Sequence, residues 1–138
     1  MSYIMSQDIL NDFTKEIVTP TVRLRLLTCG IVHYTYLPNS EINIEEHQLN
    51  HNALVEITEG KKAHLLIDSD EFINITSEAR KRIRELETVV PIKTRALIIT
   101  CLSPRILANF YIKFYKPLVP TKIFNNANDG IHWLLSLK

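Results

Sequence analysis

The sequence is poor in two residue types that mark particular protein classes. It has only three glycines and two cysteines. So few glycines exclude the Gly-x-Gly-x-x-Gly fingerprint of dinucleotide-binding proteins. Two cysteines are too few for the disulfide framework of a small secreted domain. Since Cys29 and Cys101 both lie in apolar segments, we expect small buried thiols in a cytoplasmic protein.

The sequence also lacks an excess of charge and a long apolar run. Sixteen basic and fifteen acidic side chains give a net charge of +1, so no strong field attracts nucleic acid or an anionic membrane. No apolar run approaches the roughly 18 residues that span a bilayer. The first ten residues have no basic region followed by an apolar core, as a signal peptide would. We therefore predict a soluble protein with no nucleic-acid partner and no membrane span.

What remains is typical of one globular domain, with 46% hydrophobic and 22% charged residues. Residues 1–19 are weakly patterned and predict a peripheral lead-in segment. Residues 22–26 and 31–37 alternate apolar and polar side chains around Gly30, which predicts an antiparallel hairpin. The apolar runs 63–67 and 96–99 are typical of strands buried on both faces, and residues 121–124 predict a last short strand.

Four helices follow from residues that can accept hydrogen bonds from free backbone N–H groups at a helix start. These residues are Asn43, Thr76 or Ser77, Ser103 and Asn126. In the first helix we expect a buried stripe of Leu49, Ala53, Leu54 and Ile57, and in the second a stripe of Ala79, Ile83, Leu86 and Val90. The order β-β-α-β-α-β-α-β-α requires parallel pairing of the later strands. We predict a single α/β domain over residues 1–138, with a mixed, mostly parallel sheet of about five strands and an N-terminal antiparallel hairpin.

Several stretches carry a family resemblance: residues 65–68, 75–80, 96–100 and 120–124, with Ala127 and residues 133–134. Together they resemble the STAS-like family of anti-sigma-factor antagonists, and within it a group of small uncharacterised bacterial proteins. The resemblance covers residues 20–138 and implies a STAS-like fold. It also implies a non-enzymatic regulatory or protein-interaction module.

The second helix start bears on the regulatory mechanism of that family. In the antagonists, a serine in an Asp-Ser-Ser-Gly turn is phosphorylated and controls partner binding. The corresponding turn here reads Thr76-Ser77-Glu78-Ala79, without the aspartate and the glycine. Glu78 would place a fixed charge there if it aligns with the phosphoserine. Helix capping explains Thr76 and Ser77 without a switch.

Polar residues after the buried strands form a candidate ligand site, because open α/β sheets bind ligands at this end. The candidates are Asp68, Ser69, Asp70, Thr76, Ser77 and Ser103. By resemblance, the ligand of this alternative function would be a nucleotide or a lipid. The Asp68-x-Asp70 pair is also similar to that of Mg²⁺-dependent phosphatases. Because the preceding hairpin and helix do not fit those enzymes, we expect no catalytic residues and no cofactor.

Two further features concern the helices. His47 and His51 stand four residues apart, a spacing that can share a metal, but no further ligand completes a set and we expect two solvated histidines. The third helix carries a second apolar strip of Ala108, Ile112 and Tyr115, opposite its inward stripe. Either other segments such as residues 1–19 cover this strip, or it binds a protein partner or a second copy of the chain as a homodimer.

Overall fold

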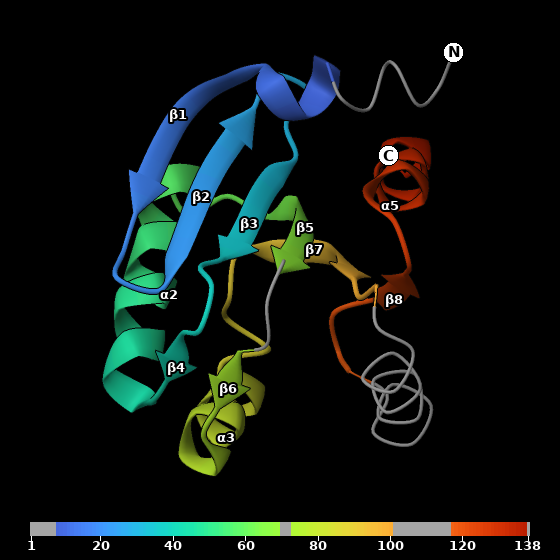
Figure 1. Ribbon diagram of the computed structural model, residues 1–138. Coiled ribbons are helices and arrows are strands. Elements are labelled where there is room, and N and C mark those ends of the chain that lie inside the picture. The colour runs from blue at the N-terminus through green and yellow to red at the C-terminus, as the bar shows by residue number, and fades with distance from the viewer. Residues whose placement is uncertain (1–7, 70–72, 101–116, 138) are drawn as a thin grey trace.

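The structure is a computed structural model, and it describes residues 8–69, 73–100 and 117–137. Within these residues a six-stranded sheet has the order β1-β2-β3-β5-β7-β8 (Figure 1). Its strands are β1 (Phe13–Val18), β2 (Val22–Leu27), β3 (Val32–Tyr36), β5 (Ala63–Ser69), β7 (Ile92–Ile98) and β8 (Thr121–Phe124). Two short strands, β4 (Glu41–Ile42) and β6 (Asn74–Ile75), pair in parallel apart from this sheet. The helices are α2 (Ile44–Thr58), α3 (Ser77–Glu85) and α5 (Ala127–Ser136).

The sheet confirms the predicted α/β fold. β1, β2 and β3 pair antiparallel, and β3, β5, β7 and β8 pair in parallel. The predicted hairpin is β2–β3, with Val22 opposite Tyr36 and Leu26 opposite Val32. The lead-in segment contains a strand that the sequence did not predict, the edge strand β1. Five of its six residues are exposed, so its sequence carries no apolar alternation.

The predicted helix starts are confirmed where the structure describes them. Asn43 accepts a hydrogen bond from the Glu46 amide at 2.9 Å, and Asn126 accepts one from the Asp129 amide at 2.8 Å. Of the two candidates at α3, Thr76 is the cap. The predicted third helix and Cys101 lie outside the described residues. The expectation for Cys29 is wrong: it is exposed, because it lies in the turn between β2 and β3.

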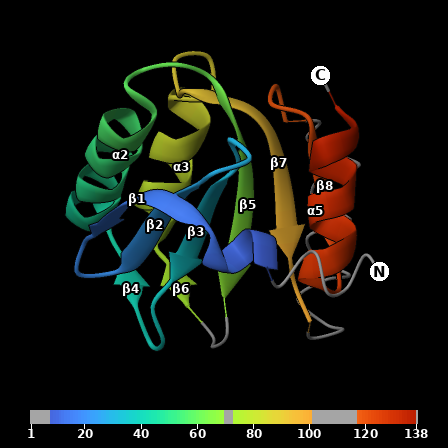
Figure 2. The same cartoon turned by 90° about the horizontal axis from the view of Figure 1, so that it is seen from above.

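Two apolar cores lie on opposite faces of the sheet. Successive residues of a strand point to opposite faces, and Leu65 belongs to the core under α2 whereas Leu66 belongs to the core under α5. Figure 2 shows α2 and α3 together and α5 apart from them. The inner side of α2 differs from its predicted stripe. Leu49 is 46% exposed, and Asn50 next to it is 1% exposed.

Candidate functional site

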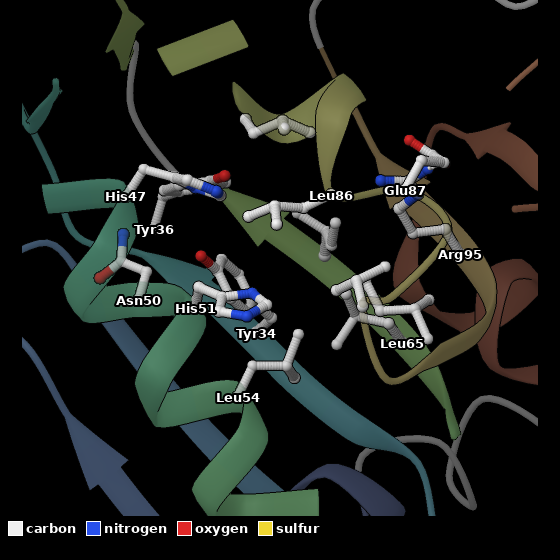
Figure 3. A pocket seen from close by; sticks show the side chains of 14 residues that line it. Tyr34, Tyr36, His47, Asn50, His51, Leu54, Leu65, Leu86, Glu87 and Arg95 are labelled. Carbon is white, nitrogen blue, oxygen red and sulfur yellow. Dashed lines mark hydrogen bonds and ion pairs between the residues drawn. The ribbon is translucent and has the colours of Figure 1, made fainter. Parts of the chain in front are cut away.

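A cavity lies between α2, α3 and the sheet (Figure 3). The space in which the centre of a water molecule can move amounts to about 70 Å³, several times what one buried water needs. Its apolar lining consists of Leu54, Leu65, Ile67, Ile83, Leu86, Val90 and Ile92. Its polar lining consists of Tyr34, Tyr36, His47, Asn50, His51, Glu87 and Arg95. Apolar and polar side chains thus line the cavity in equal number, a combination that can both bury an apolar group and bind a polar one.

The cavity exists because α3 is short. The helix ends at Glu85, and a turn carries the chain on to β7. Of the predicted α3 stripe only Ala79 is buried, at 0% exposure. Ile83, Leu86 and Val90 are half-buried and border the cavity. The turn therefore supplies an apolar wall with room in front of it.

His47 and His51 line the cavity, so the expectation of two solvated histidines is wrong. Both imidazoles project from α2 toward the side of Leu86 (Figure 3), and their ring centroids are 6.3 Å apart. Burial lowers the pKa of His47, with further lowering from the nearby His51 and Arg82. Burial and Arg82 also lower the pKa of His51. The Nε2 atom of His47 is buried and has no hydrogen-bond partner in the described structure.

Asn50 joins the part of α2 that carries the two histidines to the sheet. It lies three residues after His47, and His51 lies four residues after His47, so each of the two is a neighbour of His47 on the helix surface. Its Oδ1 accepts a hydrogen bond from Thr19 Oγ1 at 2.6 Å, and its Nδ2 donates one to Thr21 Oγ1 at 2.9 Å. These bonds join α2 to the turn between β1 and β2. They hold the histidine side of the helix toward the sheet.

Two tyrosines form part of the sheet floor. Tyr34 and Tyr36 are alternate residues of β3, so both face α2. Their rings meet edge to face, with centroids 5.2 Å apart. Burial is the main cause that raises the pKa of each phenol above its usual value of 10.0. Both phenols therefore stay protonated at neutral pH and can donate a hydrogen bond.

Glu87 and Arg95 close the far side of the cavity. Their side chains are 9% and 13% exposed and form an ion pair. The Glu87 carboxylate also accepts a hydrogen bond from the Val119 amide at 3.2 Å. Arg95 Nε donates to Thr121 Oγ1 at 3.2 Å. The acidic group of the lining is thus fully engaged, and the pair joins the turn after α3 to β7 and to the start of β8.

The sequence-predicted site residues lie elsewhere. Asp68 is near the end of β5 on the α5 face, where its Oδ2 is 3.7 Å from His33 Nε2. Ser69 ends β5 beside Tyr36. Thr76 Oγ1 accepts the Ala79 amide at 3.2 Å, and Ser77 begins α3. The remaining candidates lie outside the described residues: Asp70, Ser103, Ala108, Ile112 and Tyr115. A ligand or partner role for any of these residues stays a prediction.

In the described parts of the chain, no group of three or more His, Cys, Asp or Glu side chains could hold a metal ion. The spacing of His47 and His51 drew attention to the pair in the sequence, but only as a metal site that was set aside. Their side of the helix was misassigned because Leu49 was placed in the buried stripe. Neighbouring helical residues point about 100° apart, so exchanging Leu49 for Asn50 turns that stripe toward both histidines.

The described part of the chain has no helix that is long and apolar enough to cross a membrane. A comparison with curated proteins gives no match. Among solved structures, the chain is similar to an uncharacterised protein of the DUF3478 family from Shewanella loihica PV-4, which has a SpoIIAA-like fold. The two share 13% identity over 87% of this chain and 90% of that one, with a TM-score of 0.57. This similarity shows the fold, which is the STAS-like fold that the sequence resembles. The family model described as a domain of unknown function, DUF7793, matches residues 26–138, and the chain belongs to this family.

Proposed function

We propose that this chain is a non-enzymatic regulatory module that binds a small molecule in the cavity between α2 and α3. The observation that supports it is a largely apolar cavity lined by a histidine whose buried Nε2 has no partner among the residues that the structure describes. Buried polar atoms are nearly always satisfied, and an exception in a cavity favours a water or a ligand at that point. A hydrogen-bond donor or acceptor on a bound molecule would satisfy it.

The polar groups around the cavity favour recognition over bond-breaking chemistry. Glu87 and Arg95 bond each other, and Asn50 bonds Thr19 and Thr21. The phenols of Tyr34 and Tyr36 stay protonated and can only donate or accept a hydrogen bond. This arrangement leaves the two imidazoles and the two phenols as the polar groups that can bind a ligand. A ligand there would bridge α2 and α3, and it would therefore order the short helix α3 that borders the cavity.

The chain would regulate by presenting a surface that another protein binds. The third-helix strip of Ala108, Ile112 and Tyr115 stays our candidate for this surface, with a protein partner or a second copy of the chain as its occupant. A variant with Ile112→Asp and Tyr115→Ser should keep the fold and change the mass measured by light scattering. Identical monomer masses for both proteins would contradict self-association.

A fragment screen tests the cavity. Ligand-observed NMR is run on the wild type, on Leu86→Trp, which fills the cavity, and on Val89→Trp. Val89 lies in the same turn, is 68% exposed and is not part of the lining, so it is a matched control. We expect fragments that bind the wild type and Val89→Trp but not Leu86→Trp. The proposal fails if no fragment binds, or if Leu86→Trp binds the same fragments equally well.

A further inference from the structure

The charges around the cavity are unequal in sign. His47 and His51 face it from α2, and Arg82 on α3 is close enough to lower the pKa of both. Arg82 makes a loose contact of 3.6 Å with Glu85, and both side chains are about half exposed. On the sheet side lie the neutral phenols, and beyond them the pair of Glu87 and Arg95. The groups free to meet a ligand are therefore basic or neutral.

Among the described residues of the lining, a ligand with a positive charge would find no free carboxylate. Glu87 is already engaged by Arg95 and by the Val119 amide. A ligand with a negative charge would meet two imidazoles that have the positive charge of Arg82 nearby. The rest of the lining is apolar, from Leu54 on α2 to Ile92 on β7. A ligand that satisfies both parts has an apolar body and one anionic group.

Resting on the proposed function, we infer that the cavity binds a small amphipathic carboxylate, with its apolar body against the sheet and its carboxylate at His47 and His51. The buried Nε2 of His47 then gains a charged partner. A charge-assisted hydrogen bond is about twice as strong as a neutral one, so the carboxylate adds affinity beyond what the apolar body supplies.

This arrangement couples binding to proton uptake. Burial and neighbouring positive charge favour the neutral imidazoles in the empty cavity. A bound carboxylate favours the protonated form and raises the pKa of both histidines. Affinity is then highest where the imidazoles are already protonated, and it falls as the pH rises through their pKa in the complex. Among the described residues, the groups opposite the imidazoles are Arg82 and the phenols of Tyr34 and Tyr36 (Figure 3), and none of the three supplies a negative charge at neutral pH.

Calorimetric titration with hexanoate and with hexan-1-ol tests the inference, since the two probes share an apolar body and differ in charge. At about pH 6, where hexanoate is ionised, we expect it to bind the wild type on the order of tenfold more tightly than the alcohol. The preference should shrink toward about pH 8. The binding heat of hexanoate should depend on the ionisation enthalpy of the buffer, which reports proton uptake. This readout uses the wild type and needs no variant.

The variant His47→Gln/His51→Gln should lose the pH dependence and keep the affinity for the alcohol. His132→Gln is the matched control, because His132 is exposed on α5, and it should behave as the wild type. Equal affinity for hexanoate and the alcohol at every pH, or no binding of hexanoate, would overturn the carboxylate inference. In that case fragments blocked by Leu86→Trp would still support the cavity, whereas their absence would overturn the proposed function as well.

Discussion

Removing one partner of the pair between Glu87 and Arg95 should destabilise the protein far more than removing both. Each side chain is almost fully buried, so a single truncation leaves an uncompensated charge in the interior. Such losses amount to about 3–5 kcal/mol in the free energy of unfolding. We expect Arg95→Met to lose this amount. We expect Glu87→Ala to lose at least as much, because it leaves the charge of Arg95 unpaired and also leaves the Val119 amide without its acceptor.

The double variant should be no less stable than Glu87→Ala alone. Methionine in place of the arginine then lies in an apolar site without an opposite charge to satisfy. The unpaired Val119 amide keeps a loss of about 1–3 kcal/mol. Urea denaturation of the wild type, both single variants and the double variant gives the coupling energy of a double-mutant cycle. If the two single losses simply add in the double variant, the reasoning about a buried pair is refuted.

Three further predictions concern the helices and the histidines. Thr76→Ala should lose about 1 kcal/mol of stability in thermal unfolding because α3 loses its cap, whereas Ser77→Ala should change little. Gly130→Val should lose about 1–3 kcal/mol, because a Cβ on Gly130 would lie 2.8 Å from Ile98 Cδ1 and 3.1 Å from Leu66 Cδ1; an unchanged unfolding midpoint would contradict this packing. The pKa of His47 and of His51 is lower in the folded protein than in the unfolded chain. The contribution of the neutral imidazoles to the free energy of unfolding is therefore complete above the unfolded pKa of about 6.5, and it is lost as the pH falls through the folded pKa. Urea denaturation against pH should show a smaller acid loss in His47→Gln/His51→Gln.

The sequence predicts the fold well where the controlling interactions are local. The caps at Asn43, Thr76 and Asn126 each depend on an amide three residues further along, and the structure contains all three. The hairpin follows from alternation within each strand. β1 escapes prediction because its residues are exposed, and its position depends on pairing with β2. The residues of β1 alone therefore do not indicate that the segment forms a strand.

The cavity was also hard to predict because it depends on contacts between residues that are distant in the sequence. A buried asparagine inside α2 contradicts local pattern rules, and it is stable only because Thr19 and Thr21 reach it from the turn between β1 and β2. Without those partners, Leu49 is the better candidate for the inner side. The cavity itself also depends on where α3 ends. Leu86 and Val90 continue the apolar period of the helix, so the sequence does not reveal that the chain turns away before them.

The half-buried wall of the cavity lowers the stability of the empty protein. Apolar groups that border a void lose the contacts that close packing would give, so Leu86→Trp should raise the unfolding temperature of the ligand-free protein. If the cavity has no function, this rise in unfolding temperature should be the only effect of Leu86→Trp. If the cavity is a binding site, the same substitution should abolish the further rise that bound fragments give the wild type. Substitutions that stabilise a protein at a functional site commonly impair its function. An unchanged rise with fragments in Leu86→Trp would show that they bind elsewhere, and the void would then be only a defect of packing.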